Sequence, residues 1–253
     1  MILNDFSLAG KTALVTGGNT GIGRAVCLAF ADAGADVVVA WHSDERAAGA
    51  LVECIEDRGR RAVAVEVNVT QQSSVEHLFE QALRSFDDVN ILVNNAGVQH
   101  RVSMLEMSVN DFDAMLAVHL RGTFLCSQTF ARHRISSGGQ GRIINLCSQL
   151  GYIGRAEYVG YSTAKGGLIS MTRAMAKEFA PHGILVNGVA PGLVDTGFDP
   201  LTDEAKQAHA HALPLKRLGE VDDMTSAFVF LASEAGRYYC GQLLHPNGGE
   251  IMP

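Results

Sequence analysis

The chain has 253 residues, of which 47% are hydrophobic and 19% charged, so its composition is typical of a globular protein with one sizeable core. A formal net charge of −7 argues against a nucleic-acid partner, because nucleic-acid binding requires a basic face. We expect neither a membrane span nor a signal peptide, since no apolar run could cross a bilayer and no basic segment opens the chain.

Short apolar segments alternate with longer amphipathic segments along the chain. Strands are expected, in chain order, at 12–16, 36–41, 62–67, 90–94, 142–147, 184–190 and 242–245. Helices are expected at about 22–33, 44–58, 71–86, 111–136, 159–180 and 221–232. This alternation predicts an α/β fold, a single doubly wound domain over residues 1–253 with a mostly parallel sheet. The irregular segment at about 192–216, which holds Pro200 and Pro214, is the candidate for a lid over a substrate site.

A glycine-rich segment follows the first expected strand and opens the first expected helix. It reads Thr16-Gly17-Gly18-Asn19-Thr20-Gly21-Ile22-Gly23. Glycines let the backbone approach a pyrophosphate closely, and a helix N-terminus offers it free N–H groups. The alternative is an ordinary tight turn between a strand and a helix. The position between strand and helix favours the phosphate-binding interpretation.

Tyr161 and Lys165 lie four residues apart on an expected helix and therefore share one face. An ammonium close to a phenol favours the phenolate and lowers the tyrosine pKa from about 10 toward the working pH. Tyr161 could then exchange a proton with an alcohol or a ketone. Ser148, at the end of the fifth expected strand, could polarise the same substrate oxygen. A plain surface pair is the alternative for a tyrosine and a lysine at this spacing.

Five motifs in order identify a resemblance. They are TGxxxGIG at 16–23, NNAG at 94–97, a serine at Ser148, YxxxK at 161–165, and Pro191-Gly192 with Thr196. With them the sequence resembles the short-chain dehydrogenase/reductase family over essentially its whole length. The resemblance implies a Rossmann-type domain with about seven parallel strands, and hydride transfer between a nicotinamide cofactor and a secondary alcohol or ketone. It assigns Tyr161 as acid/base, Ser148 to the substrate oxygen, and Lys165 to the nicotinamide ribose. It also implies a homotetramer in which the 111–136 and 159–180 helices pair across a twofold axis.

The same resemblance gives a set of expected cofactor contacts. They are Gly17, Asn19, Thr20, Gly21, Ile22, Gly23, Trp41, His42, Ser43, Asn68, Val69, Asn95, Ala96, Gly97, Tyr161, Lys165, Pro191, Gly192, Val194 and Thr196. Trp41 replaces the carboxylate that would hold the ribose 2′-hydroxyl of NAD, and His42 and Ser43 stand where NADP enzymes often read the phosphate. NADP is therefore favoured. NAD is the alternative, because Thr20 replaces the basic residue that many NADP enzymes of the family carry.

Three positions depart from the family pattern, and one of them, Asn247 in place of an aspartate before Gly248-Gly249, has no functional interpretation. His119 stands where the family has an asparagine thought to hold a water for a proton relay from the lysine. We expect His119 to take over this catalytic role and to add an ionisation near its unperturbed pKa of about 6.5, shifted by its burial; the alternative is that it packs between helices. Asn68 stands where an aspartate usually reads the adenine amino group. Its amide oxygen is expected to accept that hydrogen bond.

The residues expected around the substrate are largely polar. They are Gln99, His100, Arg101, Gln149, Arg155, Tyr158 and the 193–215 segment. This set favours a sugar, sugar acid or polyol, with a 3-oxoacyl thioester as the alternative substrate. A dinucleotide-sensing protein without catalysis and an idle assembly subunit are further alternatives from other functional classes.

Neither the histidines nor the cysteines indicate a metal site. His182, His209, His211 and His245 show no clear ligand spacing. The five cysteines form no CxxC pair and are odd in number, which favours reduced thiols and a cytoplasmic location.

Overall fold

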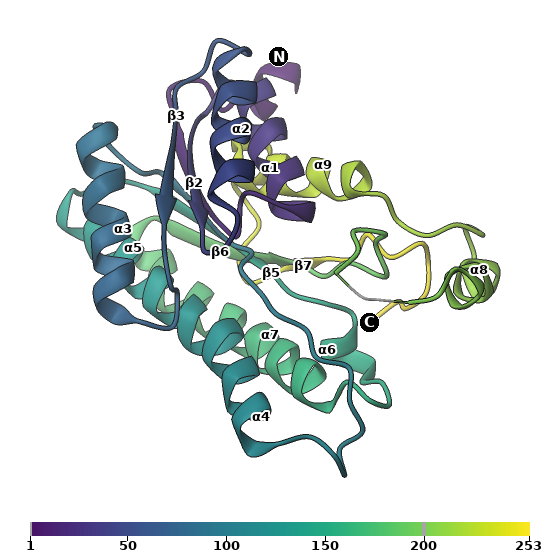
Figure 1. Ribbon diagram of the computed structural model, residues 1–253. Coiled ribbons are helices and arrows are strands. Elements are labelled where there is room, and N and C mark those ends of the chain that lie inside the picture. Colours follow the sequence, from purple (N-terminus) through teal and green to yellow (C-terminus); the bar gives the residue numbers. More distant parts are fainter. Residues whose placement is uncertain (1, 199–200) are drawn as a thin grey trace.

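The computed structural model describes residues 2–198 and 201–253, and these ranges form a seven-stranded parallel sheet between two layers of helices (Figure 1). The strand order is β3-β2-β1-β4-β5-β6-β7, and every neighbouring pair runs parallel. The strands are β1 Thr12–Thr16, β2 Asp36–Trp41, β3 Ala62–Glu66, β4 Ile91–Asn94, β5 Gly141–Leu146, β6 Ile184–Val189 and β7 Leu243–Leu244. The predicted Rossmann-like α/β architecture is confirmed.

Helices cover both faces of the sheet. The helices are α1 Gly21–Asp32, α2 Glu45–Glu56, α3 Gln72–Ser85, α4 Val109–Leu116, α5 Thr123–Ser136, α6 Leu150–Ile153, α7 Val159–Phe179, α8 Asp203–Ala212 and α9 Val221–Ala232. Helices α1, α2 and α9 pack on one face, and α3, α5 and α7 on the other (Figure 1). Short 3₁₀ turns lie at Ile2–Phe6, Ala180–His182 and Glu234–Gly236.

The alternation of side chains along the central strands explains this layering. In β2, Val37 and Val39 join the core under α1 and α9, while Val38 and Ala40 join the core under α3 and α5. All four side chains are fully buried, so both faces of the strand must be apolar. The near-continuous valine run in the sequence is a direct consequence.

The strand order reverses between β1 and β4, which pair side by side at Ala13 and Ile91. In sheets of this kind the loops at the carboxyl ends of the two strands diverge there and leave a crevice for a ligand. The glycine-rich loop follows β1 and the NNAG segment follows β4, so the topology itself brings these two motifs together.

One expectation about helices needs correction. The segment predicted as one helix over 111–136 is interrupted by a π-helical turn at Ala117–Gly122, between α4 and α5. The irregular 192–216 segment contains the helix α8, whose N-cap Thr202 accepts a hydrogen bond from the backbone N–H of Ala205. Pro200 lies outside the described residues. Within the described ranges, no helix combines the length and apolar character needed to cross a membrane.

Candidate active site

The glycine-rich loop leaves the N-terminus of α1 open. Gly17 and Gly21 have φ values of +60° and +51°, which glycine adopts without strain. A Cβ on Gly23 would lie 2.2 Å from the Gly17 carbonyl oxygen, so no side chain fits there without a shift of the backbone. Thr20 occupies the N-cap but makes no capping hydrogen bond. The first-turn N–H groups of α1 therefore remain available for a phosphate.

The NNAG segment supports this loop from the side. The Asn95 amide donates to the carbonyl oxygens of Thr16 (2.9 Å) and Gly17 (2.8 Å). The Thr16 hydroxyl in turn accepts from the backbone N–H groups of Asn95 and Ala96, each at 3.0 Å. The buried Asn94 amide donates to Asn145 on the neighbouring strand β5 at 2.9 Å. These bonds fix the phosphate loop relative to the centre of the sheet.

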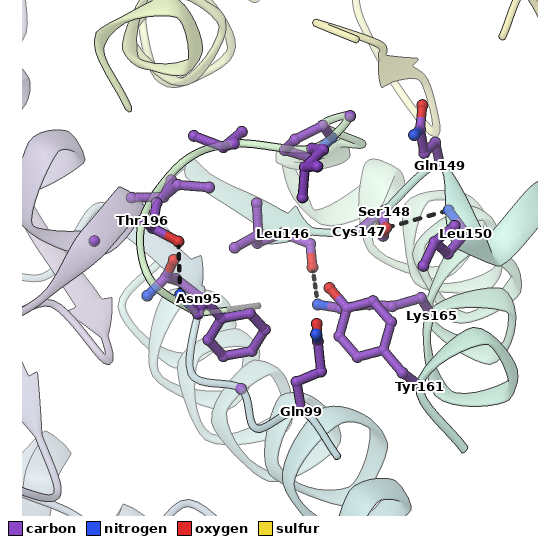
Figure 2. Close-up of a pocket in the computed structure, with 18 of the residues that line it drawn as sticks. Asn95, Gln99, Leu146, Cys147, Ser148, Gln149, Leu150, Tyr161, Lys165 and Thr196 are labelled. Atoms are coloured by element: carbon purple, nitrogen blue, oxygen red, sulfur yellow. Dashed lines mark hydrogen bonds between the residues drawn. The ribbon is translucent and has the colours of Figure 1, made fainter. Parts of the chain in front are cut away.

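Tyr161, Lys165 and Ser148 meet in the wall of one pocket (Figure 2). Lys165 is buried; its ammonium lies 5.5 Å from the centre of the Tyr161 ring and donates to the Leu146 carbonyl oxygen at 2.5 Å. Burial lowers the pKa of Lys165 to about 8. Ser148 follows β5, and its hydroxyl accepts from the Leu150 N–H at 3.2 Å. The arrangement brings a cation, a phenol and a hydroxyl to one place.

His119 also lies in this pocket wall and is 1% exposed. It sits in the π-helical turn, and its ring meets that of Tyr161 edge-on, with centroids 5.4 Å apart. Its Nε2 lies 2.7 Å from the Val98 carbonyl oxygen and 3.2 Å from the Val98 backbone nitrogen. The shorter contact joins Nε2 to an oxygen that can only accept, so we assign the proton to Nε2 as the donor of that bond. Burial and the nearby Lys165 lower the pKa of His119 to about 3. Burial therefore moves the expected ionisation well below 6.5, and the ring stays neutral near pH 7.

Many of the residues expected from the sequence line the same pocket. They are Gly17, Thr20, Gly21, Ile22, Asn95, Gly97, Gln99, His119, Ser148, Gln149, Arg155, Tyr161, Lys165, Pro191, Gly192, Val194 and Thr196. Several expected residues lie outside this wall, namely Asn19, Gly23, Trp41, His42, Ser43, Asn68, Val69, Ala96, His100, Arg101 and Tyr158. Phe198 and His209 complete the wall from the 193–215 segment, and Leu146, Cys147 and Leu150 were not expected.

The sequence interpretation missed Glu250. Its carboxylate accepts from the Gln149 amide at 2.5 Å and lies 3.1 Å from Nε2 of His209 on α8. This carboxylate therefore joins α8 to the loop that carries Ser148. No motif includes Glu250, and only the fold brings it within reach of residues so far away in the chain.

Comparison with known proteins agrees with this geometry. Residues 11–207 match the family model of the short chain dehydrogenases. The chain belongs to the short-chain dehydrogenase family. It is 40% identical over 246 residues to the 3-oxoacyl-acyl-carrier-protein reductase FabG of Aquifex aeolicus, covering 97% of this chain and 99% of the relative. It is 35% identical to glucose 1-dehydrogenase 2 of Bacillus subtilis, covering 97% of this chain and 96% of the relative.

Solved structures of the family superimpose closely on the chain. A short-chain type dehydrogenase/reductase from Mycobacterium marinum has 35% identity and a TM-score of 0.95, with complete coverage of both chains. A gluconate 5-dehydrogenase from Burkholderia cenocepacia, crystallised with NADP and tartrate, has 33% identity and a TM-score of 0.93, with 98% of each chain covered. This short-chain dehydrogenase is an oxidoreductase that acts on CH–OH or keto groups.

Beyond the pocket, the β2–α2 loop of this short-chain dehydrogenase is tied to the glycine-rich loop. The Asn19 amide donates to the Ser43 carbonyl oxygen at 2.7 Å. His42 and Ser43 are exposed, and the nearby carboxylate of Asp44 is used to cap α2 by accepting from the Ala47 N–H. The last residue of β2 is Trp41, so the strand ends without a carboxylate.

Asn68 does not have the free oxygen that the sequence interpretation required. Its side-chain oxygen accepts from both the backbone N–H and the hydroxyl of Thr70, at 3.0 and 2.7 Å. An amide oxygen has two lone pairs, and these bonds use both. To accept from an adenine amino group, as expected, this oxygen would have to give up one of the two bonds from Thr70. Val69 is buried and packs against Gly122 at the end of the π-helical turn.

Proposed function

We propose that the protein transfers a hydride between NADP and a secondary alcohol or ketone, with Tyr161 as acid/base. The observation that carries this proposal is the meeting of Tyr161, Lys165 and Ser148 in the pocket that begins at the glycine-rich loop. A dinucleotide-sensing protein would need the loop but not this group of three. The chain is inferred to act as a single NAD(P)-binding domain, with the 192–216 segment as its substrate loop.

The residues present fit a nicotinamide dinucleotide. The open N-terminus of α1 and the crowded glycines at Gly17 and Gly23 suit a pyrophosphate. The Lys165 ammonium and the segment from Pro191 to Thr196 would hold the nicotinamide half, and the exposed His42 and Ser43 the adenosine half. When bound, the dinucleotide supplies the acceptor or donor of the hydride.

The chain's own residues would then move the proton. In the oxidation direction, the Tyr161 phenolate oxygen accepts the proton of the substrate hydroxyl while the carbinol carbon loses its hydride. In the reverse direction, the phenol returns that proton to the ketone oxygen. The Ser148 hydroxyl holds the same substrate oxygen. The Lys165 ammonium favours the phenolate, and the phenolate in turn favours the charged lysine.

His119 is proposed to position this group. Its Nε2 holds the Val98 backbone, and its Nδ1 is buried without a hydrogen-bond partner among the described residues. With Nε2 protonated, Nδ1 is an acceptor, and a water molecule is the partner that such a site favours. This supports the role expected for His119, as a neutral anchor of a water and not as a titrating group.

NADP is favoured over NAD because of the β2–α2 loop. Trp41 cannot repel a 2′-phosphate, and the exposed His42 and Ser43 can donate hydrogen bonds to it. The similar gluconate 5-dehydrogenase of Burkholderia cenocepacia was crystallised with NADP. NAD remains the alternative cofactor, and the ratio of kcat/KM for the two decides between them.

The substrate is proposed to be a polar sugar, sugar acid or polyol. The amides of Gln99 and Gln149 and the guanidinium of Arg155 line the pocket beside its apolar side chains, and such polar groups suit the hydroxyl groups of a ligand. The alternative, a 3-oxoacyl thioester, is the substrate class named for the FabG relative. The two substrate classes are distinguished by a screen of sugars, sugar acids, polyols and 3-oxoacyl thioesters in which the absorbance of NADPH reports turnover. Turnover of the thioesters alone would contradict it.

We also infer a homotetramer in a reducing, cytoplasmic compartment. Exposed apolar side chains lie in the region expected to pair between subunits. Val109 is on α4, Phe124 is on α5, and Leu105 precedes α4. The five cysteines are free in the described structure. Light scattering at working concentration tests the assembly, and a monomer would contradict it.

A further inference from the structure

Among the described residues that line the pocket, the charged and histidine side chains are all basic. Among the described residues that line it there are Arg155, Lys165, His119 and His209, and no aspartate or glutamate. Lys165 is buried against the Leu146 carbonyl, and His119 is neutral. His209 is engaged by Glu250 from outside the wall. Arg155 is therefore the permanent cation that the pocket wall can offer to a ligand.

Arg155 lies in the loop between α6 and α7, between Ser148 and Tyr161 in the chain, and it is exposed. Its guanidinium carbon lies 5.3 Å from the centre of the Tyr158 ring, which is itself 1% exposed. A guanidinium stacked on a fixed ring keeps its N–H groups free at the edge, in the fork that fits a carboxylate.

The nearby carboxylate is already used. Glu157 pairs with Arg101 at 2.6 Å, and within residues 2–198 and 201–253 no carboxylate forms a salt bridge with Arg155. The Glu157 carbonyl oxygen also accepts from the Val102 N–H at 2.9 Å. These two bonds hold the loop against the 101–102 segment, and no carboxylate of the described residues compensates the Arg155 charge.

Two side-chain amides in the same pocket wall each have a polar atom that is available for a further hydrogen bond. Nε2 of Gln99 is buried and has no hydrogen-bond partner among the described residues, and Figure 2 shows this side chain pointing toward the Tyr161 ring. Oε1 of Gln149 is likewise buried without a partner, and its orientation is fixed because Nε2 donates to Glu250. One donor and one acceptor suit the hydroxyl groups of a ligand.

We propose that Arg155 binds the carboxylate of an anionic, hydroxyl-rich substrate, so that the enzyme selects sugar acids over neutral polyols. This inference rests on the proposed function and adds to it the substrate's charge. The carboxylate would form a bidentate ion pair with the guanidinium. The hydroxyl groups would bind the two glutamine amides, and one secondary hydroxyl or keto group would face Tyr161 and Ser148.

The test compares sugar acids with the alditols of the same carbon chain, such as D-gluconate with D-sorbitol and D-mannonate with D-mannitol. Each is measured as a substrate with NADP, or as a competitive inhibitor of whichever substrate the screen yields. Arg155→Gln should lower kcat/KM, or raise the inhibition constant, for the acids by about 10- to 100-fold, as expected for a charged hydrogen bond. The change should lie mainly in KM, and the alditols should change by less than about threefold.

Two controls make the result specific. Arg155→Lys keeps the charge without the fork and should retain part of the preference, whereas Arg84→Gln removes an exposed arginine on α3, outside the pocket wall, and should change nothing. Added salt should weaken binding of the acids by the wild type more than by Arg155→Gln.

Three outcomes would be informative in different ways. Equal losses for acids and alditols, or no loss for the acids, would overturn the role of Arg155. Turnover of neutral alcohols or ketones without any binding of the acids would overturn the inference while leaving the proposed function intact. Absence of turnover with every alcohol and ketone would overturn the proposed function itself.

Discussion

The imidazole of His119 meets the ring of Tyr161 at 88°, with the two centroids 5.4 Å apart. The π-helical turn at Ala117–Gly122 carries the histidine, and such turns often occur at functional sites because the extra residue re-aims a side chain. Gly97 packs against this ring, since a Cβ there would lie 2.6 Å from Cε1 of His119. The histidine therefore braces the proposed acid/base and the NNAG segment at the same time.

His119→Asn should keep much of the activity, because an amide can also bind both the Val98 backbone and a water. His119→Ala should lower kcat by about tenfold or more, since no polar group remains in a buried site. The pKa of His119 is about 3, so neither the wild type nor His119→Asn should show a histidine ionisation between pH 5 and 8. An ionisation near 6.5 that disappears in His119→Asn would contradict this interpretation.

The same pKa predicts a loss of stability in acid. The folded-state pKa of His119 is about 3 and the unfolded value about 6.5, so between these pH values the unfolded chain binds the extra proton. Stability should therefore fall as pH decreases below about 6.5, by about 2 kcal/mol at pH 5 from this group alone.

Urea unfolding at pH 7 and pH 5 measures this effect, with His119→Asn as the comparison. The wild type should lose about 2 kcal/mol more than the variant between the two pH values. Because both proteins keep every other titratable group, equal losses would show that the histidine does not stay neutral when buried.

Tyr161→Phe should lower turnover by about 10²- to 10⁴-fold, the usual contribution of a general acid/base. NADP binding, followed by fluorescence, should be almost unchanged, because the glycine-rich loop and Lys165 remain. Retention of more than about a tenth of the wild-type rate, with chemistry shown to be rate-limiting, would remove Tyr161 from its proposed role.

Trp41→Asp should shift the cofactor preference toward NAD by placing a carboxylate where a 2′-phosphate would lie. Trp41 packs against the core under α1, so the substitution also costs stability. Trp41→Asn is the matched control, since it removes the ring but adds no charge. The ratio of kcat/KM for NAD and NADP should change more in Trp41→Asp than in Trp41→Asn. Identical ratios in the two variants would show that charge at this position does not affect the cofactor preference.

The sequence correctly predicted those elements whose local residue pattern follows from their burial or from a contiguous motif. The valine run of β2 predicted its strand because both faces are buried, and the glycine-rich loop was placed correctly because its motif is contiguous. The π-helical turn was not predicted, since a slip in hydrogen-bond register leaves no mark in composition. The two hydrogen bonds that Thr70 donates to the Asn68 side-chain oxygen were not predicted, because no sequence pattern indicates them.

Glu250 was missed for a related reason. It lies 3.1 Å from His209 and 2.5 Å from Gln149, but these partners are 41 and 101 residues away in the chain. No short-range pattern encodes such a contact. Because the carboxylate joins α8 to the loop after Ser148, its removal should loosen the substrate side of the pocket and leave the cofactor side intact.

Glu250→Ala should therefore raise the KM for substrate by about five- to tenfold, the cost of a lost charged hydrogen bond in a partly exposed site, with a smaller change in kcat. NADP affinity should stay within about twofold, because the glycine-rich loop does not touch Glu250. Hydrogen exchange of the α8 amides, Asp203–Ala212, should become faster, since the helix loses the contact that holds it over the pocket. Glu178→Ala, an exposed glutamate on α7, is the control for the change in charge. Unchanged exchange in α8 together with a raised KM would mean that Glu250 acts on the Gln149 amide alone, and unchanged values of both would exclude it as a positioning residue.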